Sequence, residues 1–136
     1  MNRNILAVIF VLIIASCAKN DCNGDLDGTW QMISWQTVDG THQIADKTSG
    51  IYWHFKLSLL KTHKPSESLY YLSYFKYTSD SIIIEKTYRS PYDEPAPLTE
   101  LSPYGVPVDG KFRIEKLDND YMQLRSSTNR LSFRKY

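Results

Sequence analysis

Apolar and polar residues alternate along several short segments of the chain, and the first of these segments runs from residue 26 to residue 38. Its two sets of positions are Trp30, Met32 and Ser34 on one face and Gln31, Ile33 and Trp35 on the other. Successive side chains of a strand point to opposite faces, so this pattern predicts a strand that is partly apolar on both faces. Asp27 and Gly28 supply the preceding turn, because glycine accepts a positive φ.

The alternation continues after a polar segment, residues 38–50, that is expected to be a loop with at most one helical turn. A second strand is predicted over residues 51–59, with Ile51, Trp53, Phe55, Leu57 and Leu59 on one face. Residues 61–68, which include Pro65, are expected to form the turn to a third strand over residues 69–77. The β-branched run that opens residues 82–88 predicts a fourth strand.

A proline-rich segment interrupts this pattern between residues 90 and 110, which contain five of the six prolines. Proline has no N–H to donate to a neighbouring strand, so the segment is not expected to contain a central strand. Residues 97–101 are predicted to form a single helical turn. The apolar residues Leu98, Leu101, Tyr104 and Val106 indicate that the segment packs on the domain as a lid, a binding loop or a covered crossing.

Three short strands complete the chain, over residues 112–117, 121–126 and 131–134, with tight turns between them. The pattern thus predicts seven strands, and an eighth would lie in the proline-rich segment. Eight antiparallel strands at this spacing fit a small closed barrel. A β-sandwich is the alternative, because both architectures have the same period of two.

The first predicted strand carries a family resemblance. Gly28-Thr29-Trp30 resembles the Gly-x-Trp signature of the lipocalin and lipocalin-like proteins. The resemblance implies an up-and-down barrel that Trp30 closes at one end, covered by an arginine from near the C-terminus. Arg134 is the candidate for that arginine, and Arg125 is the second choice. A cation on an indole face contributes ~0.5–2 kcal/mol.

The N-terminus predicts export and lipidation. Arg3 precedes an apolar run from Ile5 to Ile14, which at ~1.5 Å per residue is too short to span a ~30 Å bilayer core. The following Ile14-Ala15-Ser16-Cys17 resembles a bacterial lipobox. Residues 1–16 would then be a removed signal peptide, Cys17 the lipidated first residue, residues 17–25 a flexible tether and residues 26–136 the domain. Ordinary cleavage after Ser16 is the alternative.

Two further expectations follow from that N-terminus. Ala18 stands where an aspartate would retain a lipoprotein at the inner membrane, so we expect the outer membrane of the cell envelope. Lipidation would also leave Cys22 as the one remaining thiol of the two cysteines. Cys22 would then be a free thiol or form an intermolecular disulfide. Without lipidation, a Cys17–Cys22 bridge is the further alternative.

Charge and motifs exclude several classes of function. Removal of Arg3 with the signal peptide leaves 15 basic residues against the 15 acidic ones, so there is no basic excess for nucleic acid. His42, His54 and His63 lack zinc-ligand spacing, and no Gly-x-Ser-x-Gly elbow occurs. The alternating acidic and amide residues before Gly28 resemble a calcium loop started at Asn23, but its twelfth position is Ser34 rather than glutamate. We therefore expect no cofactor, no metal and no catalysis.

Two classes of binding function are left. The lipocalin-like resemblance implies that the barrel binds a small apolar or amphipathic molecule, and its wall candidates are Trp53, Phe55, Tyr71 and Phe75. In the second class the interior is filled, and the outer surface around residues 88–104 binds an envelope protein or inhibits a hydrolase. A fold of this kind is compatible with both classes.

Overall fold

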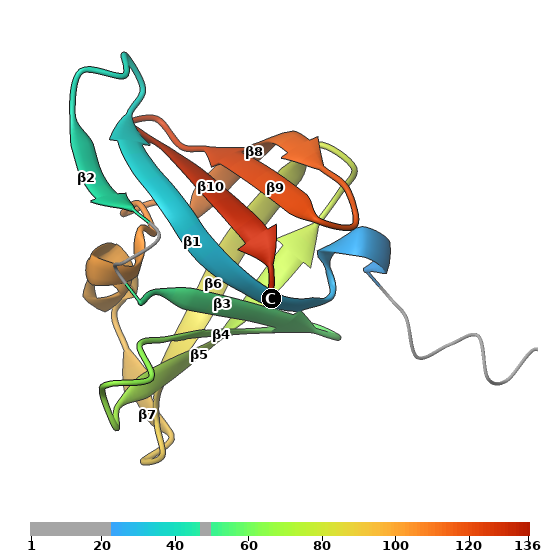
Figure 1. Ribbon diagram of the computed structural model, residues 1–136. Helices are drawn as coiled ribbons and strands as arrows, with labels where there is room; N and C mark the ends of the chain where they lie inside the picture. The colour runs from blue at the N-terminus through green and yellow to red at the C-terminus, as the bar shows by residue number, and fades with distance from the viewer. Residues whose placement is uncertain (1–22, 47–49) are drawn as a thin grey trace, which may run out of the picture.

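The computed structural model describes residues 23–46 and 50–136, so Cys17, Cys22 and the predicted signal peptide lie outside the described residues. Almost all of the regular structure is extended (Figure 1). The strands are β1 (Gly28–Thr37), β2 (Gln43–Asp46), β3 (Tyr52–Lys56), β4 (Leu59–His63), β5 (Tyr70–Tyr77), β6 (Ser81–Ser90), β7 (Glu94–Ala96), β8 (Lys111–Leu117), β9 (Tyr121–Arg125) and β10 (Asn129–Lys135). Two 3₁₀ helices, η2 (Gly24–Leu26) and η3 (Leu98–Tyr104), complete the described elements. None of the described helices is long and apolar enough to cross a membrane.

The strands form a closed antiparallel barrel. Hydrogen-bonded neighbours follow the order β10, β9, β8, β6, β5, β4, β3, β1, and β10 then pairs with β1 to close the ring. In this closing seam Gln31 is opposite Arg134 and Trp35 is opposite Leu131. The eight-stranded barrel predicted from the sequence is confirmed, and the alternative of a β-sandwich is wrong.

The eighth strand comes from a different place than predicted. The segment expected to be one strand over residues 51–59 is the hairpin of β3 and β4, because the chain reverses at Leu57 and Ser58. Leu57 has a positive φ of 55° and is 51% exposed, although the alternation assigned it to the apolar face. Residues 59–63, part of which was expected to be a turn, therefore form β4.

Two short strands lie outside the eight. β2 pairs with the second half of β1, within the segment predicted to be a loop. β7 pairs with β6 at the start of the proline-rich segment. The helical turn predicted over residues 97–101 is confirmed as the first part of η3, which follows Pro97. Figure 1 shows η3 as a coil on the left, between β2 and β7.

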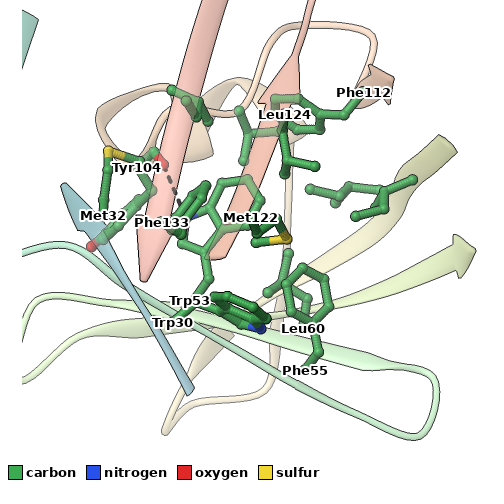
Figure 2. Close-up of a cluster of buried hydrophobic side chains, with 14 of the residues drawn as sticks. Trp30, Met32, Trp53, Phe55, Leu60, Tyr104, Phe112, Met122, Leu124 and Phe133 are labelled. Carbon is green, nitrogen blue, oxygen red and sulfur yellow. Dashed lines mark hydrogen bonds between the residues drawn. The ribbon is translucent and has the colours of Figure 1, made fainter. Parts of the chain in front are cut away.

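The interior of the barrel is packed with large side chains. The rings of Trp53 and Phe133 lie 4.9 Å apart, and Phe112 and Phe55 flank Trp53 at 5.6 and 6.1 Å between centroids. Figure 2 shows these rings together with Met122 and other buried residues from several strands. Aromatic pairs at such distances add stability beyond the burial of their apolar area.

One end of the barrel is closed around Trp30, but by a different cation than expected. Trp30 is fully buried, and its Nε1 donates to the carbonyl oxygen of Leu26 in η2. The expected partner Arg134 is exposed and donates to Gln31 on the outer surface. Lys135 lies over the indole instead, with its Nζ 4.2 Å from the ring centroid. The alternation explains the correction: Leu131, Phe133 and Lys135 share the inner face of β10, and Arg134 is on the outer face.

The folded contacts begin at Asn23, earlier than the predicted domain boundary at Leu26. The Asn23 side chain donates to Asp27 Oδ1 at 2.7 Å and to the Leu57 carbonyl oxygen at 2.8 Å. Residues 23–25, which the sequence assigned to the tether, thus join the turn between β3 and β4 to the start of β1.

Candidate ligand site at the rim of the barrel

The helix η3 and the loop after it pack against the core of the barrel. Trp53 Nε1 donates to the carbonyl oxygen of Tyr104 at 3.0 Å, which ties the end of η3 to the centre of the core. Gly105 then adopts a φ of +93°, and a Cβ at this position would lie 3.0 Å from Leu131 and 3.1 Å from Met32. The chain can approach the core this closely because residue 105 has no side chain.

A charged contact fixes the start of η3. Glu100 accepts hydrogen bonds from both Nε and Nη2 of Arg89 on β6, and Tyr71 OH donates to its Oε2 at 2.9 Å. The hydrogen bonds from Arg89 hold the pKa of Glu100 below its ordinary value. Burial raises the pKa of Tyr71, and the neighbouring Glu100 carboxylate raises it further. Glu100 is therefore an anion that anchors η3 to the barrel wall.

The far end of η3 carries a weaker polar contact. Tyr104 OH donates to Glu67 Oε2 at 3.3 Å, and Lys64 Nζ lies 5.6 Å from the centroid of the Tyr104 ring. Burial, reinforced by the charge of Glu67, raises the pKa of Tyr104 to about 12. The Tyr104 hydroxyl is neutral at physiological pH and acts as a hydrogen-bond donor.

A pocket of about 640 Å³ opens between the loop after η3 and the ends of β1 and β10. We call it the rim pocket, and its lining residues are Trp35, Thr99, Ser102, Pro103, Gly105, Val106, Pro107, Val108, Thr128 and Asn129. Its wall combines apolar groups with a few hydroxyl and amide groups. A volume of this size falls in the range that holds small molecules, ~300–1,000 Å³.

Trp35 supplies the largest side chain of the rim pocket. An irregularity in the register of β1 between Met32 and Ser34 places Trp35 opposite the buried Leu131, so its ring packs against the core. Its Nε1 is buried and has no hydrogen-bond partner among the described residues. A buried N–H without a partner costs about 1–3 kcal/mol, and most such groups in proteins are satisfied. Trp35 thus brings a buried donor that no described residue satisfies to the wall of the rim pocket.

The predicted wall residues are buried in the packed core and do not line an open interior. Phe55 and Phe75 lie 5.1 Å apart between ring centroids, and Phe55 also packs on Trp53. Tyr71 packs on Tyr104 at 5.7 Å. Of the four, Phe75 also lines a pocket of about 410 Å³ near η2, with Leu57 and Tyr77 among its neighbours. The sequence placed these residues correctly on inward faces but did not show that their rings fill the space between them.

The comparison of sequences decides the family. A family described as a lipocalin-like domain matches residues 11–136. The chain belongs to the lipocalin-like family. No curated protein matches the sequence.

Two solved structures resemble this lipocalin-like domain. A lipocalin-like protein from Bacteroides uniformis ATCC 8492 has 22% identity and a TM-score of 0.59, and the match covers 83% of this chain and 100% of that one. An uncharacterized protein from Bacteroides eggerthii DSM 20697 has 22% identity and a TM-score of 0.56, with 82% and 99% covered. At this identity the likeness shows the shared fold.

The histidines of the lipocalin-like domain do not line the rim pocket. His54 Nδ1 and Thr29 Oγ1 lie 2.7 Å apart, and His63 stacks on Tyr52 with 5.7 Å between centroids. Burial lowers the pKa of both imidazoles, and nearby lysines lower it further. Among the described residues no group of three or more His, Cys, Asp or Glu side chains could hold a metal ion.

Proposed function

We propose that the protein is an outer-membrane lipoprotein, anchored through Cys17, whose lipocalin-like domain binds a small apolar or amphipathic molecule in the rim pocket without catalysis. The observation that carries the ligand proposal is the unpartnered indole N–H of Trp35 in the wall of an apolar pocket of about 640 Å³. The pocket accommodates the apolar part of a ligand, and the indole N–H donates a hydrogen bond to one of the ligand's oxygen atoms.

The packed interior supports a site at the rim rather than inside the barrel. Ligand entry into the centre would require the rings of Trp53, Phe133 and Phe55 to separate, all of which are fully buried. Displacing large core side chains costs several kcal/mol. The rim pocket is already open and therefore needs no such rearrangement.

Native mass spectrometry of the chain starting at Ala18, recovered from its own cell extract, tests the ligand proposal. We expect a bound small molecule on the wild type and its loss in Ser102→Trp, which places an indole in the rim pocket. Ser79→Trp, an exposed turn residue that does not line this pocket, is the matched control and should keep the molecule. Recovery of the wild type without a ligand from several extracts, or retention in Ser102→Trp, would contradict the proposal.

Mass spectrometry of the mature N-terminus tests the anchor. We expect a chain that starts at Cys17 and carries a diacylglyceryl group, and we expect Cys17→Ser to leave the membrane fraction. Two or more acyl chains make a stable anchor at about 0.8 kcal/mol per buried CH₂ group. A mature chain that starts at Cys17 without added lipid mass would contradict lipidation and support ordinary cleavage.

The packed interior also favours a second candidate function, the binding of an envelope protein. Tyr92 is 71% exposed and Val108 is 77% exposed, and both lie on the proline-rich segment. Exposed apolar residues of this kind contribute to protein interfaces. Chemical cross-linking in the intact envelope tests it: a partner captured by the wild type should be lost in Tyr92→Ser, because Tyr92 is exposed and does not line the rim pocket. Capture that is unchanged by this substitution would contradict this second function.

A further inference from the structure

The outer face of β8, β9 and β10 carries a concentration of positive charge. Its cations are Lys111, Arg113, Lys116, Arg125, Arg130 and Arg134, and its only acidic residue in these three strands is Glu115. The whole sequence has 16 basic and 15 acidic residues, so this face holds a local excess in a nearly neutral chain. A surface of one sign attracts ligands of the opposite charge.

Three arginines occupy neighbouring positions across these strands. Arg125 on β9 is directly opposite Arg113 on β8 and directly opposite Arg130 on β10. Glu115 neutralises Arg130, with 2.7 Å between Nε and Oε1. Among the described residues, Arg113 and Arg125 form no ion pair of this kind. Both arginines lie close enough to Glu115 to lower the pKa of its carboxyl group. Like charges directly opposite each other destabilise a sheet, so a further anion that binds between Arg113 and Arg125 would relieve their repulsion.

Arg113 and Arg125 line a second pocket, of about 520 Å³, which we call the basic pocket. Lys111 and the hydroxyl residues Ser126 and Ser127 also line it. Two acidic residues are present as well: Asp80 accepts from the Thr78 hydroxyl, and Asp109 accepts from the backbone N–H of Lys111. The carboxylate of each aspartate thus accepts a hydrogen bond within its own turn.

The basic pocket adjoins the rim pocket. Ser127 lines the basic pocket and the next residue, Thr128, lines the rim pocket. In the same way Val108 lines the rim pocket and Asp109 lines the basic pocket. The two pockets thus lie on either side of residues 108–109 and 127–128, and one molecule with an apolar body and an anionic end would have to cross these segments to occupy both.

We propose that the ligand is an anionic amphiphile, whose apolar part occupies the rim pocket and whose phosphate headgroup binds Arg113 and Arg125 in the basic pocket. This inference rests on the proposed function, because it names the class of ligand for the same site. Arginine suits this role, since its guanidinium binds a phosphate group through two parallel N–H···O bonds. The adjacent hydroxyl group of Ser127 adds a neutral hydrogen-bond donor, whereas the Ser126 hydroxyl already donates to the carbonyl oxygen of Asn129.

Calorimetric titration with two amphiphiles of equal chain length tests the inference. Dodecyl phosphate and neutral dodecyl maltoside, both below their critical micelle concentrations, are titrated into the chain starting at Ala18. We expect dodecyl phosphate to bind at least tenfold more tightly, and Arg113→Gln/Arg125→Gln to remove this preference while dodecyl maltoside binding stays unchanged. Arg134→Gln removes one positive charge from the same face outside both pockets and is the control, with the preference retained.

The outcomes separate the inference from the proposed function. Equal binding of the two amphiphiles, or a preference that survives Arg113→Gln/Arg125→Gln, overturns the headgroup assignment and leaves the rim pocket as the ligand site. Failure of both amphiphiles to bind overturns the inference together with the small-molecule function. Inorganic phosphate tests the source of the anion: binding as tight as that of dodecyl phosphate would overturn the amphiphile assignment. An unchanged or higher thermal midpoint of the double variant shows that it is folded.

Discussion

Lys135 covers the indole face of Trp30, with 4.2 Å between the ammonium nitrogen and the ring centroid. The same ammonium donates to the backbone carbonyl oxygens of Asp25 and Asp27. One side chain near the end of β10 therefore joins the first strand, the preceding turn and the buried tryptophan that closes this end of the barrel.

Lys135→Met should lower the free energy of unfolding by roughly 1–3 kcal/mol, because it removes the cation over the ring and the charged hydrogen bonds but keeps an apolar side chain of similar length. Urea denaturation followed by tryptophan fluorescence measures the change. Arg134→Met is the control, and it should cost less than about 0.5 kcal/mol because Arg134 is exposed. Equal losses in both variants would contradict the assignment of Lys135 as the capping cation.

Gly110→Ala should be far more destabilising than Gly40→Ala. Both glycines have a positive φ, +66° and +74°, so both substitutions cost about 1–2 kcal/mol of backbone strain. A Cβ at Gly110 would also lie 2.3 Å from the carbonyl oxygen of Ile84, whereas one at Gly40 meets nothing within 4 Å. We expect an additional loss of about 1–3 kcal/mol at Gly110. Similar unfolding midpoints for the two variants would refute the close approach of this loop to β6.

The contact of Glu100 with Arg89 should make the docking of η3 sensitive to acid. The folded pKa of Glu100 lies below its ordinary value of 4.5. Its stabilising effect is therefore fully present above that value and is lost as the pH falls through the folded pKa. Amide hydrogen exchange of residues 98–104, compared between about pH 5 and pH 3 after correction for intrinsic rates, measures this loss.

Glu100→Gln provides the comparison for that experiment. The variant should show faster exchange in η3 at pH 5 and a smaller further change on acidification, because its amide does not titrate. Other carboxylates with lowered pKa values, such as Asp118, are present in both chains, so they cancel in the comparison. Parallel pH profiles for the two chains would rule out a role for Glu100 in holding η3.

Arg125→Gln should raise stability at low salt in the absence of a ligand. Arg125 has an arginine directly opposite on each neighbouring strand, and relief of such repulsion contributes ~0.2–1 kcal/mol. The gain should shrink at high ionic strength, since salt screens exposed charges. Thermal denaturation at two salt concentrations measures it. A loss of stability that does not depend on salt would contradict the repulsion.

The period of two predicted most of the strands because most of them have one buried and one exposed face. It failed between residues 51 and 59, where Leu57 continues the apolar alternation although the chain turns there. Residues with a positive φ are usually glycine, asparagine or aspartate, so a leucine gave no local sign of a turn. The pairing of β3 with β4, a tertiary effect, sets the turn at this position.

The candidate site was less predictable than the fold. The alternation of Leu131 and Phe133 places Lys135 as the next inward residue of β10, so the cation over Trp30 was predictable from the pattern. The family resemblance implied an arginine instead. Trp35 could not have been placed, because the irregularity in β1 after Met32 has no signal in the sequence. The rim and basic pockets form where loops from distant parts of the chain meet, and such neighbours cannot be read from spacing along one segment.

The seam between β1 and β10 also determines when the domain can fold. Gln31 and Arg134 are 103 residues apart in the chain and form a hydrogen bond across this seam, so the ring cannot close until β10 has been synthesised and released from the ribosome. Until then β1 and β9 are edge strands with unpaired backbone N–H and C=O groups. Such edges can pair with strands of other chains, which leads to aggregation. Loss of β10 by truncation would make this transient hazard permanent.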